Sequence, residues 1–88
     1  MARYISSHTT ACMTRQVLEQ LVKGMHSASD ETVRFVRLRG NLIEGKLIGE
    51  FEAPSLDLLT EWFKQQKIHF DWLLRVEFEY DGPSIKNV

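Results

Sequence analysis

Residues 72–80 read WLLRVEFEY, and this stretch decides the fold. Apolar and charged side chains alternate along it, with Leu74, Val76, Phe78 and Tyr80 set against Arg75, Glu77 and Glu79. A period of two is typical of a β-strand that buries one face and exposes the other. We therefore predict a strand over residues 72–80 whose apolar set faces the core.

Upstream of this strand the pattern changes to helical spacing in two segments. The first stripe recurs every four residues at Met13, Val17, Leu21 and Met25, and the second comprises Leu56, Leu59 and Phe63. Thr14 and Ser55 precede these stripes and are typical N-cap residues. Three further strands are predicted over residues 3–9, 32–39 and 46–52.

The resulting order is strand, helix, strand, strand, helix, strand, which is the split βαβ plan of a ferredoxin-like α+β domain. Two helices cover only one face of a four-stranded antiparallel sheet, so the other face is expected to be open. We predict a single domain over residues 1–83. Residues 84–88 follow Asp81-Gly82-Pro83 and are expected to form a flexible C-terminal tail.

Composition excludes several classes of protein. The chain has 88 residues, and 11 basic against 12 acidic residues give a net charge of -1, so nucleic-acid binding through bulk charge is not expected. No apolar run approaches the roughly 18 residues of a membrane span, and the N-terminus has no signal-peptide pattern. We expect a small cytoplasmic protein. Cys12 is the one cysteine, which excludes an internal disulfide and a multi-cysteine zinc site.

The open face of the sheet is the first candidate for function. Its expected side chains are Arg75, Glu77 and Glu79 on the last strand, Ile48, Glu50 and Glu52 on the third, and Tyr4, Ser6 and His8 on the first. Such a face is either solvated, covered by another subunit or part of a ligand site. Sheets of this plan often pair with a second copy, so we predict a homodimer, with a dimeric α/β barrel as its expected form.

A second candidate is one rim of the sheet, where residues distant in sequence are expected to converge. The ferredoxin-like strand order brings the end of the first strand, with His8, next to the loop that carries His69 and Asp71, and Cys12 follows on the adjoining loop. Two imidazoles and a carboxylate suit a divalent metal such as nickel or zinc. The alternative readings are structural: a hydrogen-bonded His8, an outward-pointing His69 and an Asp71 that shapes its loop.

The chain also resembles a family of small bacterial ferredoxin-like proteins described as nickel-binding. The resemblance rests on Ala2-Arg3-Tyr4 and His8 in the first strand, on Glu52-Ala53-Pro54-Ser55 before the second helix, and on His69. It implies a dimer that binds a divalent ion through histidine and oxygen ligands. Of the family's positions, the resemblance transfers only His8 and His69.

Three functional hypotheses follow from the sequence. The first is a metal-binding dimer that holds nickel or zinc through His8, His69 and Asp71 or water. The second is a small cofactor-independent enzyme of the dimeric α/β-barrel type, in which Tyr4 joins the two histidines around a small-molecule ligand that the sequence does not name. The third is a non-catalytic interaction module whose open sheet face binds a partner.

Overall fold

The structure is a computed structural model that describes residues 1–88. Its elements are β1 (Ala2–Thr9), α1 (Arg15–Ala28), β2 (Arg34–Asn41), β3 (Lys46–Ala53), α2 (Leu56–Gln65), β4 (Trp72–Arg75), β5 (Phe78–Asp81) and β6 (Ser84–Asn87). The first six follow the predicted βαββαβ order. The predicted α+β, ferredoxin-like architecture is therefore confirmed, and a terminal hairpin of β5 and β6 follows it.

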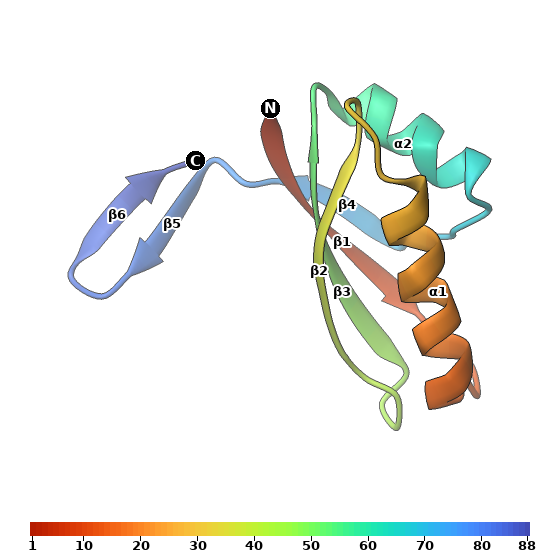
Figure 1. The fold of residues 1–88 in the computed structure, drawn as a ribbon. Helices are drawn as coiled ribbons and strands as arrows, with labels where there is room; N and C mark the ends of the chain where they lie inside the picture. The colour runs from red at the N-terminus through yellow and green to blue at the C-terminus, as the bar shows by residue number, and fades with distance from the viewer.

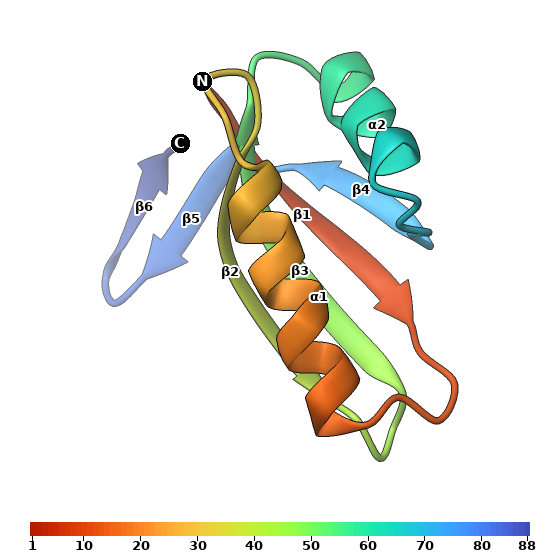
Figure 2. The same cartoon turned by 45° about the vertical axis from the view of Figure 1, so that its right-hand side comes forward.

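The main sheet has the strand order β2-β3-β1-β4 with antiparallel pairing between neighbours. Both helices lie on one side of this sheet, as Figure 1 and the turned view in Figure 2 show. The opposite side is the open face. The β5–β6 hairpin projects away from the helical layer (Figure 1).

Both helices begin where their capping residues predict. The hydroxyl oxygen of Thr14 accepts a hydrogen bond from the backbone N–H of Val17 at 3.2 Å. The hydroxyl of Ser55 caps α2 in the same way, accepting from Leu58 N–H at 3.2 Å. These bonds satisfy amide groups that have no partner within the helix.

The core lies between the helices and the sheet and is rich in aromatic rings. The Phe51 ring is fully buried, and its centroid lies 5.0 Å from that of Phe63 and 5.3 Å from that of Phe35. Edge and tilted contacts at such distances add to the burial of apolar surface. Leu59 and Trp62 of α2 complete this layer, so α2 is firmly anchored on the sheet.

The predicted facing of the first strand is wrong. Tyr4 pairs with Phe51 across the β1–β3 ladder, and cross-strand partners point to the same face, so Tyr4 lies in the core. Ser6 and His8 share that face and are buried, although we predicted them on the open side. Ile5 pairs with Glu50 and lies on the open face instead. Because side chains alternate between the two faces of a strand, an error of one residue in the predicted facing moves every side chain to the opposite face.

The same inversion affects the last strand. Leu73 pairs with Ser6 and packs against the core cluster, whereas Leu74 pairs with Ile5 and is 55% exposed on the open face. The prediction that Leu74 faces the helices is therefore wrong. On β3 the predicted facing is correct, because Leu47 and Phe51 are buried while Ile48 lies on the other side.

The predicted strand over residues 72–80 is divided into β4 and β5. Val76 N–H still donates to the carbonyl of Arg3 at 2.9 Å. Because β1 begins at Ala2, the residues after Val76 have no further part of β1 to pair with. They turn away from the sheet, and β5 pairs with β6 instead. Gly82 takes a positive φ of 69° at the turn, which is the geometry of a two-residue hairpin loop. Ser84–Asn87, expected as part of a flexible tail, forms the strand β6 of this hairpin.

Candidate functional site

The rim at the end of β1 brings together the predicted residues His8, His69 and Asp71, but in unequal roles. His8 is 7% exposed, and both of its ring nitrogens have partners. Nδ1 lies 2.7 Å from the backbone carbonyl oxygen of His69, and Nε2 lies 2.7 Å from the hydroxyl of Ser6. The His8 ring thus ties β1 to the loop that leads into β4.

These partners determine the tautomer of His8. A carbonyl oxygen only accepts hydrogen bonds, so Nδ1 must donate to His69. In the neutral ring Nε2 then carries the lone pair and accepts the proton of the Ser6 hydroxyl. A metal ion needs such a lone pair, and here Ser6, which is fully buried, already uses it. The geometry of His8 therefore does not fit a metal ligand.

Asp71 lies on the outer side of the same rim in a small polar cluster. Its carboxylate accepts a hydrogen bond from the Thr9 hydroxyl at 2.6 Å, and the Lys46 ammonium lies 3.6 Å away. Lys46 also donates to Thr9 Oγ1 at 2.8 Å. The hydrogen bond from Thr9, followed by the positive charge of Lys46, lowers the pKa of Asp71 below its usual range.

The remaining rim residues lie apart from this cluster. The side chain of His69 is exposed, and His69 contacts His8 through its backbone rather than its ring. Cys12 is exposed in the loop between β1 and α1 and has a left-handed φ of 55°.

No group of three or more His, Cys, Asp or Glu side chains is placed to hold a metal ion. Nickel or zinc binding at His8, His69 and Asp71 stays a prediction, while the contacts assign His8 and Asp71 to structural bonds.

The open face has a charged half, built on β2, β3 and the start of β1. Glu50 lies between two arginines, with Oε2 3.5 Å from Arg3 Nε and 3.7 Å from Arg37 Nε. Arg34 pairs with Glu52 at 3.5 Å in the next row. These pairs are partly exposed, so each contributes at most about 1 kcal/mol to stability.

The other half of the open face is apolar. We call Ile5, Ile48, Trp72 and Leu74 the apolar patch. Ser7 pairs with both Ile48 and Trp72, and Ile5 pairs with Leu74, so the four side chains lie in two adjacent rows on one face. The exposed fractions are 38% for Ile48, 47% for Trp72 and 55% for Leu74. Contiguous exposed apolar side chains of this kind mark binding surfaces.

The hairpin of residues 78–87, which we call the arm, adds a second exposed apolar surface. Tyr80 pairs with Ile85, and Phe78 lies two residues before Tyr80, so all three share one face of the arm. They are 56% (Phe78), 66% (Tyr80) and 63% (Ile85) exposed. The other face is charged, and its Glu79 carboxylate lies 4.0 Å from Arg3 on the open face of the sheet.

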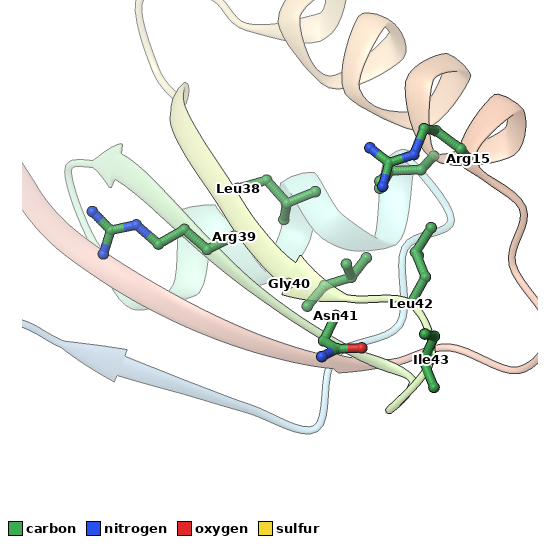
Figure 3. Close-up of a pocket in the computed structure, with 9 residues that line it drawn as sticks. Arg15, Leu38, Arg39, Gly40, Asn41, Leu42 and Ile43 are labelled. Carbon is green, nitrogen blue, oxygen red and sulfur yellow. The ribbon is translucent and has the colours of Figure 1, made fainter.

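A pocket of about 320 Å³ lies on the helical side, between the start of α1 and the β2–β3 turn (Figure 3). Leu18, Leu38 and Leu42 supply apolar walls, and Arg15 stands at its edge. Figure 3 shows Arg39 pointing away from it, on the opposite side of β2 from Leu38. The pocket could take a small apolar group next to an anion, but it contains no paired acid and base.

Sequence reasoning found the rim but missed the apolar patch and the arm. The signal for the arm was present in residues 78–87, where Phe78, Tyr80 and Ile85 flank a Gly82-Pro83 turn. The prediction of a flexible tail from residue 84 treats this turn as the end of the domain. The signal for the patch was weaker, because Leu73 and Leu74 are adjacent leucines and alternation alone does not say which of them faces inward.

Comparisons with known proteins support the fold. A scan of protein-family models and a search of curated proteins find no match. Among solved structures, the chain is similar to the crystal structure of SCO4226 from Streptomyces coelicolor A3(2). The TM-score is 0.79 at 18% sequence identity, and the alignment covers 90% of this chain and 100% of that one. At this identity the likeness extends to the ferredoxin-like α+β fold alone.

Neither helix is long and apolar enough to cross a membrane.

Proposed function

We propose that this chain is a homodimeric interaction module whose open sheet face binds a second copy of itself. The observation that carries the proposal is the apolar patch of Ile5, Ile48, Trp72 and Leu74 on the side of the sheet that neither helix covers. Two such sheets packed face to face would form the dimeric α/β barrel expected from the sequence.

The size of the exposed surface supports this proposal. A folded monomer of 10.3 kDa is expected to expose about 5400 Å². This chain exposes 6292 Å², which is about 900 Å² more. A specific protein–protein interface buries about 800 Å² on each partner. The excess therefore matches the area that one stable dimer interface would remove from water.

Sedimentation equilibrium tests the proposal directly. We expect the wild-type protein to have about twice the 10.3 kDa chain mass at micromolar concentration. Leu74→Arg should give a monomer, because a charge placed in the centre of the apolar interface would be buried without a partner. Leu58→Arg is the matched control, since Leu58 is 45% exposed but lies on α2, in the helical layer.

A wild-type protein that sediments as a monomer over the whole concentration range would refute the proposal. Equal dissociation by Leu58→Arg and Leu74→Arg would also refute it, because the interface would then not be the open face.

A further inference from the structure

We infer that the two copies exchange their arms: the apolar face of each arm lies on the apolar patch of the other copy's sheet. This inference rests on the proposed homodimer and names the contact that holds it together. Phe78, Tyr80 and Ile85 form the arm surface, and Ile5, Ile48, Trp72 and Leu74 form the receiving patch.

The first step of the argument is that the arm needs a partner. An isolated two-stranded hairpin is at best marginally stable in water, because it has no layer to pack against. The exposed fractions of Phe78, Tyr80 and Ile85 all exceed one half within a single chain. Figure 1 shows the arm separated from the body of the domain and joined to it by the short segment after β4. The arm therefore presents an apolar face that its own chain leaves largely exposed.

The second step is that the arm's own sheet leaves most of the arm's apolar face uncovered. The side of the arm toward its own sheet is the charged one: Glu79 reaches Arg3 at 4.0 Å. Glu79, Tyr80 and Asp81 line a polar groove of about 610 Å³ together with Arg37 and Arg39. Ile85 lies on the opposite face of the arm from Glu79, since side chains alternate along a strand, and Tyr80 remains 66% exposed at the edge of the groove. The arm's own chain leaves more than half of each of these apolar side chains exposed, and a second copy can cover them.

The third step is that the patch and the arm match in chemistry and position. A groove of about 370 Å³ lined by Ile5, Leu74, Val76 and Phe78 connects the patch to the root of the arm. Both surfaces therefore lie on the same side of the molecule and can take part in one interface. A two-fold axis through this groove would place the arm of each copy on the patch of the other copy. Both contacts would then be used within the pair, so the assembly is closed at two copies.

Crosslinking between two different single-cysteine variants tests the exchange. Both carry Cys12→Ser, which removes the exposed native thiol. One carries Ile85→Cys in the arm and the other Leu74→Cys in the patch. After mixing and treatment with a short bismaleimide, we expect a crosslinked species that contains both chains. In the control mixture Glu61→Cys, in the helical layer, replaces Leu74→Cys and should give no such species.

A second variant pair measures the contribution of the arm. Tyr80→Ser with Ile85→Ser should raise the dissociation constant of the dimer by about 100-fold or more, because four apolar side chains per dimer lose their contacts. Lys86→Ser changes the other face of the same strand and should leave the constant within about threefold. Circular dichroism of each variant checks that the domain remains folded.

The outcomes separate this inference from the proposed function. A wild-type dimer that keeps its affinity in the Tyr80→Ser, Ile85→Ser variant, and that gives no Ile85–Leu74 crosslink, overturns the arm exchange and leaves the homodimer intact. A monomeric wild-type protein overturns both.

Discussion

The His8 side chain is a structural bond between two distant segments of the chain. Replacing it by alanine leaves the Ser6 hydroxyl and the His69 carbonyl without their partner inside the protein. We expect His8→Ala to lower the free energy of unfolding by about 2–4 kcal/mol, from the lost hydrogen bonds and the cavity together. Urea denaturation measures this difference.

His69→Ala is the matched control for His8→Ala. The His69 ring is exposed and only its backbone carbonyl is used, so the free energy of unfolding should change by no more than about 0.5 kcal/mol. The metal hypothesis makes a different prediction for the same pair. If nickel titration showed tight binding that both variants lose equally, His8 would be a ligand and the structural assignment would be wrong.

Asp71 gives the rim a defined pH dependence. Its pKa is lowered in the folded protein by the Thr9 hydrogen bond and the Lys46 charge, so folding favours the ionised form. The resulting stabilisation is fully present above the unfolded-state value near 3.9 and is lost as the pH falls through the lower folded-state pKa.

We therefore expect wild-type protein to lose more stability than Asp71→Asn between about pH 5 and pH 2.5. Thermal unfolding monitored by circular dichroism at a series of pH values measures this. Glu19→Gln on the exposed side of α1 is the control and should follow the wild-type curve. An Asp71→Asn curve parallel to that of the wild type would contradict the role of the Thr9–Asp71–Lys46 cluster.

At the scale of the elements, the sequence predicts the type of each segment, helix or strand, more accurately than the face that the segment buries. The caps at Thr14 and Ser55 and the apolar stripes place both helices correctly, because these signals are local. The face of β1 is decided by its register with β3, which pairs Tyr4 with Phe51. Register depends on residues that are far apart in the sequence, so alternation within one strand could not determine it.

The division of β4 from β5 has a similar cause. The alternation from Leu74 to Tyr80 is continuous, and nothing local interrupts it. What ends β4 is the extent of its neighbouring strand, since β1 begins at Ala2 and its pairing with β4 ends at Tyr4 and Arg75. The rim was predictable for the opposite reason: the strand order of the fold alone brings the end of β1 to the loop before β4.

The arm depends on a single turn, and Gly82 is the residue that allows it. Its φ of 69° lies in the left-handed region, which costs a residue with a Cβ atom roughly 1–2 kcal/mol and a β-branched residue more. We expect Gly82→Val to abolish hydrogen-exchange protection of the β5 and β6 amides while that of β1 and β3 remains. Gly24→Ala is a useful comparison, because a Cβ atom there meets open space in α1 and should stabilise the protein by about 0.5–1 kcal/mol.

Protection of the arm amides in Gly82→Val equal to that in the wild type would show that the turn does not hold the arm together. Loss of protection throughout the sheet would show instead that the arm and the domain fold as one cooperative unit.

At the scale of the whole molecule, the shape of the monomer determines how stability should depend on concentration. Its Cα radius of gyration is 13.5 Å, whereas about 12 Å is expected for a compact domain of this length. If a second copy covers the apolar patch and the arm, the folded protein is a dimer, and unfolding separates its two chains. Each tenfold rise in protein concentration then stabilises the dimer by about 1.4 kcal/mol.

We expect the unfolding midpoint to rise by about 5–11 °C between about 5 and 500 µM protein, since the folded unit is a dimer of two 88-residue chains. Scanning calorimetry measures the midpoint at each concentration. Leu74→Arg should remove this dependence by preventing association, and Leu58→Arg on α2 should retain it. A wild-type midpoint that is the same at both concentrations would mean that the apolar patch and the arm stay exposed in the native state, because a folded monomer gains nothing from the presence of other copies.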